Sequence, residues 1–105
     1  MFKIQHKPSF KTDVFLSIAG EPEGKKLEVE FKYFTKTGIR DLMERHQGGT
    51  EADMLGEAIV SWDKDVLGVD YTRETLVALL DEFPAAGSDF IIAFRRELVE
   101  SKRKN

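Results

Sequence analysis

The stretch KKLEVEFKYF (25–34) alternates apolar and polar residues from Leu27 onward. A period of two is typical of a β-strand with one buried face, because successive side chains point to opposite sides of a strand. The segment DVFLSIA (13–19) also alternates, and GEPEG (20–24), which joins the two, is rich in turn-forming residues. The sequence therefore predicts an antiparallel β-hairpin over about 13–34. The side chains expected on its buried face are Val14, Leu16, Ile18, Leu27, Val29, Phe31 and Tyr33.

Two helical patterns follow the hairpin. The first contains Ile39, Leu42 and Met43 at helical spacing and ends at QGG (47–49). The second starts at Thr50 in TEAD, a weak capping-box pattern because Asp stands where Glu or Gln is preferred. Apolar residues three and four positions apart predict that this second helix is continuous over Leu55, Ala58, Ile59 and Trp62.

The second half of the chain predicts two more helices. The segment DKDVLGVDY (63–71) is expected to be an acidic connection around a small apolar patch, with room for one short extended piece. Thr72 then caps a helix that Pro84 ends, and the last helix starts at Ser88 or Asp89. Strands followed by about four helices indicate an α+β fold. The apolar face of the last helix is expected to contain Phe90, Ile91, Phe94 and Leu98.

Length and charge predict a single domain over 1–105, with a basic N-terminal arm (1–12) and a basic C-terminal tail (100–105). Residues 1–12 carry three lysines and no acid, and the last eleven residues also have a net charge of +3. The stretch 13–94 therefore carries −9. Because such an acidic body repels the phosphate backbone, we expect no nucleic-acid binding.

The composition leaves few groups for catalysis or metal binding. The chain has no cysteine, which excludes disulfides, thiolate zinc sites and cysteine nucleophiles, and it has only two histidines, His6 and His46. His46 extends the apolar stripe that starts at Ile39 and matches no ligand motif, so a half-buried packing role is expected. The pair Gly48-Gly49 lacks the lysine of a phosphate-binding loop. We therefore expect no enzyme activity, no metal and no cofactor.

The location of the protein is also constrained. No apolar run approaches the roughly 20 residues that span a bilayer, and MFKIQHKPSF (1–10) lacks the apolar core of a signal peptide. A cytoplasmic protein with no membrane partner is expected.

Aromatic residues are the main candidates for a contact surface. Phe34 lies on the outer face of its predicted strand, and Trp62 and Tyr71 lie near the ends of predicted elements, as does Phe10. Exposed aromatic residues suit a protein interface, although the edge of a small core could need the same rings. Four other rings are expected to face inward: Phe31, Tyr33, Phe83 and Phe94.

A more specific pattern lies in the order of these landmarks over about 30–105. The segments IVSWDKD (59–65), YTRETLVALLDEFPAA (71–86) and FIIAFRRELVESKRKN (90–105) follow the strand-to-helix stretch EFKYFTKTGIRDLM (30–43). This order resembles that of the small tail assembly chaperones of long-tailed bacteriophages and prophages. The positions that match the family pattern are Trp62, Asp63, Tyr71 and Pro84.

The resemblance implies a non-enzymatic role. Members of this family bind the long, largely helical tape measure protein, keep it soluble and help to recruit tail tube subunits around it. It also implies a place in the cytoplasm of the bacterial host and absence from the mature virion. The contact surface is then expected around Phe34, Trp62, Tyr71, Arg95 and Arg96. Association of the chain with itself stays an open alternative.

Two other classes of protein remain as alternatives. A structural phage component, such as a tail-completion or head–tail joining protein, is also a small α+β domain, but it would remain in purified virions. A small nucleic-acid-binding regulator could use the basic segment Arg95–Lys104. Its affinity would fall steeply with salt, and the acidic body argues against it.

Overall fold

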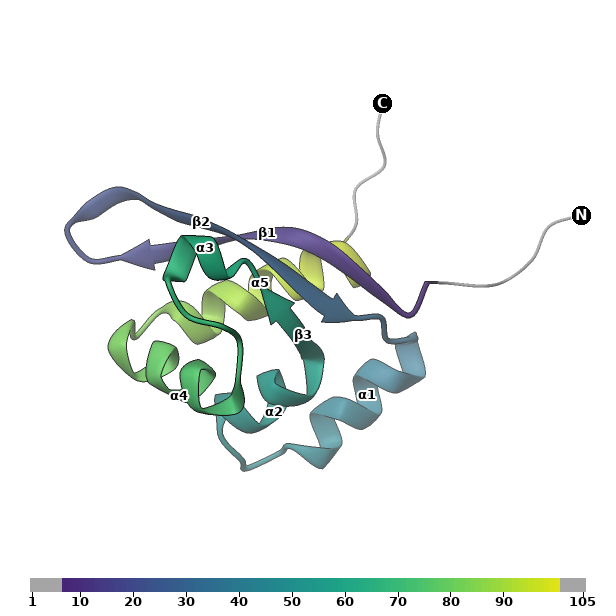
Figure 1. Ribbon diagram of the computed structural model, residues 1–105. Helices are drawn as coiled ribbons and strands as arrows, with labels where there is room; N and C mark the ends of the chain where they lie inside the picture. The colour runs from purple at the N-terminus through teal and green to yellow at the C-terminus, as the bar shows by residue number, and fades with distance from the viewer. Residues whose placement is uncertain (1–6, 101–105) are drawn as a thin grey trace, which may run out of the picture.

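The computed structural model describes residues 7–100, which form a three-stranded antiparallel sheet and five helices. The strands lie in the order β1 (Ser9–Ile18), β2 (Glu21–Lys32) and β3 (Ile59–Trp62). The helices are α1 (Lys36–Arg45), α2 (Glu51–Ala58), α3 (Lys64–Leu67), α4 (Arg73–Glu82) and α5 (Ala86–Leu98). Figure 1 shows α1, α2, α4 and α5 on one side of the sheet. The predicted α+β fold with an N-terminal hairpin is confirmed.

The hairpin is longer than its predicted span. β1 begins at Ser9, so the four residues 9–12 lie in the sheet, whereas 1–6 and 101–105 of the predicted arm and tail lie outside the described residues. The turn consists of Ala19 and Gly20, and most of the predicted loop GEPEG belongs to β2. Partners in the register share a face, as Val14 and Leu27 do, and the buried face carries the apolar residues of both strands.

The predicted continuous helix through Trp62 is wrong. α2 ends at Ala58, and Ile59–Trp62 forms β3, which pairs with β2. Residues three apart in a regular strand face opposite sides, yet Ile59 and Trp62 are both buried. A register shift at Val60 explains this, because the extra residue of a β-bulge returns the next side chains to the same face.

The helix boundaries are confirmed in part. Thr72 caps α4 as predicted, since its hydroxyl oxygen accepts a bond of 3.0 Å from the Thr75 amide. The short helix α3 replaces the predicted connection and is capped by the Asp63 carboxylate, which accepts a bond of 3.0 Å from the Asp65 amide. α5 begins at Ala86 rather than at Ser88 or Asp89.

Most of the predicted inward-facing rings lie in the core. Phe31 and Phe94 are buried with ring centroids 5.3 Å apart, and Phe83 is half-buried. Tyr33 is an exception: β2 ends at Lys32, which leaves the Tyr33 side chain past the strand and 39% exposed.

Helix α5 runs along the free edge of β1. The Asp89 carboxylate accepts bonds from the amide (2.7 Å) and hydroxyl (3.2 Å) of Ser17. Further along, Arg96 Nη2 donates to the Thr12 hydroxyl and to the Asp13 carbonyl oxygen, both at 2.9 Å. Because β1 has a strand neighbour on one side only, these side chains satisfy backbone groups that the sheet leaves unpaired.

Candidate binding groove

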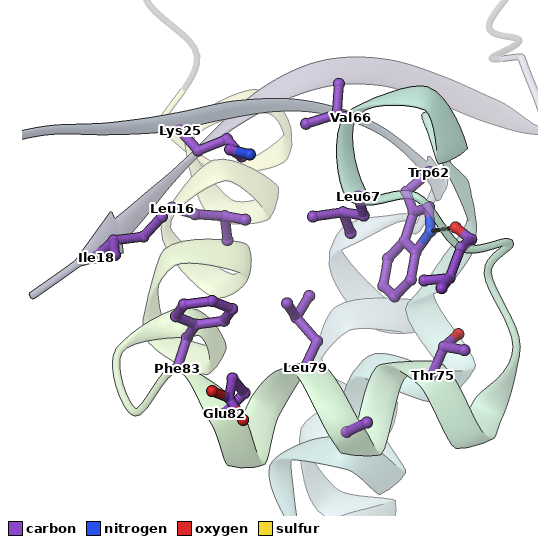
Figure 2. Close-up of a pocket in the computed structure, with 12 residues that line it drawn as sticks. Leu16, Ile18, Lys25, Trp62, Val66, Leu67, Thr75, Leu79, Glu82 and Phe83 are labelled. Carbon is purple, nitrogen blue, oxygen red and sulfur yellow. Dashed lines mark hydrogen bonds between the residues drawn. The ribbon is translucent and has the colours of Figure 1, made fainter. Parts of the chain in front are cut away.

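An open groove of about 420 Å³ lies between the closed end of the hairpin, α3 and α4. Figure 2 shows Leu16, Leu67 and Leu79 pointing into the same space from these three elements. Phe83 and Trp62 lie toward its two ends. The lining is therefore largely apolar, as in sites that bind apolar side chains of a ligand.

The α4 wall follows from helical spacing. Thr75, Ala78, Leu79 and Glu82 line the groove from positions three and four residues apart, which places them on one face of α4. Leu79 belongs to the core and Ala78 is exposed, so this face joins the core to the solvent.

The opposite wall contains Val66, Leu67 and Val69. Gly68 has φ 80°, a left-handed conformation that ends α3 and turns the chain so that Val69 reaches the groove. The indole Nε1 of Trp62 donates a bond of 2.9 Å to the Val69 carbonyl oxygen, which fixes this turn (Figure 2). Val69 remains 46% exposed, so the wall presents apolar surface to solvent.

Trp62 forms one end of the groove and is supported from behind. It is 7% exposed, and the Tyr71 ring packs edge-to-face on it with a centroid separation of 5.1 Å. Burial raises the pKa of the Tyr71 phenol above its usual value, and nearby Arg73 opposes that rise. Tyr71 thus packs on Trp62 without lining the groove itself.

The groove lies in the acidic part of the molecule. The segment 63–83, which supplies most of its lining, contains six acidic and two basic residues, a net charge of −4. Both basic side chains form ion pairs: Lys64 Nζ lies 3.9 Å from Asp70, and Arg73 contacts Asp53. The Arg73 guanidinium holds the pKa of the Asp53 carboxyl below its usual range.

The predicted site residues do not converge on one surface. Trp62 lines the groove and Tyr71 lies behind it, whereas Phe34 packs edge-to-face on Phe94 at 5.7 Å. Arg96 is held against β1. Arg95 lies on the same helix, with Nε 3.4 Å from a Glu100 carboxylate oxygen. The family-pattern residue Asp63 serves as the α3 cap.

One segment of the sequence points to the groove, although hydrophobic periodicity alone does not predict a groove there. The apolar patch VLGV (66–69) stands alone in an acidic connection, and three of its residues line the groove. Leu76, Leu79, Leu80 and Phe83 recur at helical spacing. This spacing indicates burial but does not show that one end of the apolar stripe borders open space.

His46 lies in a cluster of charged side chains at the contact between α1 and α2. Its Nε2 lies 2.6 Å from Glu57 Oε1, and Arg45 contacts the other oxygen of the same carboxylate. The hydrogen bonds from His46 and Arg45 lower the pKa of the Glu57 carboxyl. These contacts join the end of α1 to α2. Within residues 7–100 no three His, Asp or Glu side chains gather as metal ligands would.

The same span contains no helix whose length and apolar character would suit a membrane crossing.

No curated protein and no solved structure matches the chain. A family model does match: it describes phage tail assembly chaperones and covers residues 1–105. The resemblance carried by Trp62, Asp63, Tyr71 and Pro84 is thereby confirmed at the level of the family. The chain belongs to the phage tail assembly chaperone family.

Proposed function

We propose that this chain is a non-enzymatic chaperone that binds the phage tape measure protein in the host cytoplasm. It keeps that protein soluble, helps to bring tail tube subunits to it and leaves before the virion is mature. Family membership supports a role in tail assembly. The groove supports a partner that presents apolar side chains.

The single observation that carries the proposal is an apolar groove that the described residues leave open. Its walls are buried at the base and exposed at the rim, where Val69 and Ala78 meet solvent. An amphipathic helix can place side chains from positions i, i+3, i+4 and i+7 in a groove of this kind. A tape measure protein exposes such helix faces until the tube encloses it, and covering them prevents their aggregation.

Modest affinity is sufficient for this role. A long client offers many helical segments, so many copies of a small chaperone can bind one chain. When several weak contacts hold the same assembly, occupancy exceeds what each contact gives alone.

The proposal is tested by co-expressing the tagged chain with the tape measure protein of its own gene cluster. Ala78→Phe fills the groove from an exposed position on α4, whereas Val77→Phe adds the same ring at a neighbouring position that is 46% exposed and does not line the groove. We expect the wild type and Val77→Phe to recover soluble tape measure protein. Ala78→Phe should leave most of it in the pellet.

The opposite result would be decisive as well. If Ala78→Phe folds and still recovers the tape measure protein, the groove is not its binding site. Mass spectrometry of purified virions provides a second test, because a chaperone should be absent from them. Presence of the chain in virions would favour the structural-component alternative.

A further inference from the structure

The charges around the groove indicate which helices it accepts. Resting on the proposed function, we infer that the groove binds a basic amphipathic helix, with lysine or arginine residues along the flank that faces α4. The apolar face of that helix enters the groove and its basic flank lies over the carboxylates of α4.

Three acidic side chains flank Ala78 along the α4 rim. Glu74, Ala78, Asp81 and Glu82 are spaced at i, i+4, i+7 and i+8, which places them along one side of the helix. All four are exposed, and Ala78 and Glu82 line the groove. A helix bound beside Ala78 therefore meets carboxylates on both sides of that residue.

The two cations of this region do not neutralise the rim. Arg73 pairs with Asp53 on α2, and Lys64 pairs with Asp70 in the connection after α3. The net charge of −4 over 63–83 thus produces a negative electrostatic potential at the groove. An acidic helix, a nucleic-acid backbone and an anionic membrane surface would all be repelled.

One cation faces the acidic rim from the hairpin. Lys25 lines the groove from β2, across the space from Glu82 on α4 (Figure 2). A bound helix thus meets Lys25 at the hairpin and carboxylates along α4. This asymmetry fixes the orientation of the ligand, because its basic flank is favourable only on the α4 side.

The fluorescence of a tryptophan in the groove can be used to follow binding. Trp62 is the one tryptophan of the chain, and it lines the groove. A peptide without tryptophan or tyrosine will therefore change the emission of Trp62 when it binds there. The probes are two designed amphipathic helices with the same leucine face, one with lysine and one with glutamate along its flanks.

We expect the lysine peptide to bind the full-length chain about tenfold more tightly than the glutamate peptide at low salt. Raising the ionic strength from about 0.01 M to about 1 M shortens the range of the charges from about 30 Å to about 3 Å. The preference should disappear over this range, while the leucine-dependent binding remains.

Asp81→Lys/Glu82→Lys reverses the charge at the end of α4, where added cations suit the helix dipole. The control Glu28→Lys/Glu44→Lys makes the same change in net charge at exposed positions that do not line the groove. The first variant should prefer the glutamate peptide and the control should retain the lysine preference, with circular dichroism confirming the fold of both.

Three results would overturn the inference. Equal binding of both peptides removes the role of charge, although the groove could still bind the tape measure protein. A loss of preference in the control variant assigns the effect to net charge alone. Failure of both peptides to bind, while Ala78→Phe still abolishes recovery of the tape measure protein, leaves the proposed function intact and rejects the basic helix as the ligand.

Discussion

At the open end of the hairpin the sheet rests on a cluster of phenylalanine rings, whereas at the closed end it forms one wall of the groove. In this ring cluster Phe31 lies between Phe10 and Phe94, with centroid separations of 5.7 and 5.3 Å, and Phe34 packs on Phe94 at 5.7 Å. At the closed end, Leu16 and Ile18 of β1 face α3 and α4 across about 420 Å³ of open space.

The difference lies in the helices rather than in the sheet. β1 and β2 run through both regions, but α5 buries Phe90 and Phe94 beneath them, while α4 presents Ala78 and Leu79. Aromatic rings fill the space between layers, and shorter side chains leave it open. The space beneath the sheet is thus filled in the ring cluster and open in the groove, where apolar surface is left uncovered.

Removing a ring should produce the largest effect and separate the two regions. Phe31→Ala deletes a fully buried side chain, so unfolding should become easier by about 3–5 kcal/mol. Leu67→Ala removes a half-buried groove residue and should cost only about 1 kcal/mol while weakening binding of the lysine peptide. Urea unfolding measures both losses. Equal losses would contradict the contrast between a packed region and an open one.

A backbone substitution at the closed end should have a smaller effect. Gly24 has φ 63°, and a Cβ there would overlap the carbonyl oxygen of Leu16, which belongs to the sheet and cannot move aside. Gly24→Ala should therefore lower the free energy of unfolding by about 2–3 kcal/mol.

Gly20→Ala is the matched control in the same hairpin, because φ is 86° but nothing lies within 4 Å of the added carbon. It should cost about 1 kcal/mol, from backbone strain alone. Thermal unfolding of the two variants measures the difference, and equal melting temperatures would show that the turn accommodates the overlap.

The smallest effect is expected at the contact between α1 and α2, outside both regions. The pKa of Glu57 in the folded chain lies below the usual 4.5, so this carboxylate stabilises the fold above pH 4.5 and loses that contribution as the pH falls through its folded pKa. Glu57→Gln should be less stable than the wild type at neutral pH, with the gap closing in acid. Peptide binding in the groove should stay unchanged, and a binding defect would mean that α1 and α2 help to shape it.

The hairpin and the α4 cap could be predicted because their signals are local. Alternation over 27–33 and a threonine before an apolar stripe each specify the nearby backbone. β3 could not be predicted in this way. Leu55, Ala58, Ile59 and Trp62 fit one helical face, and only the free edge of β2 and the bulge at Val60 make the last two residues a strand.

The candidate site was harder to predict than the fold. Trp62 and Tyr71 were identified from their aromatic character, but one lines the groove and the other supports it. Arg96 is expected on a contact surface because it belongs to the basic last helix, and the sequence does not show that its guanidinium binds β1. Whether an apolar residue fills a core or borders a cavity depends on which elements meet around it, and this information is not local in the sequence.

The contacts from α5 to β1 affect how copies of the chain interact at high local concentration. On the proposed function, many copies gather along one tape measure protein at high local concentration. An unprotected strand edge would then allow one copy to add its sheet to the next, in edge-to-edge polymerisation. Asp89 and Arg96 occupy backbone groups along that edge. These two contacts therefore hinder the pairing of β1 with a strand of a neighbouring copy.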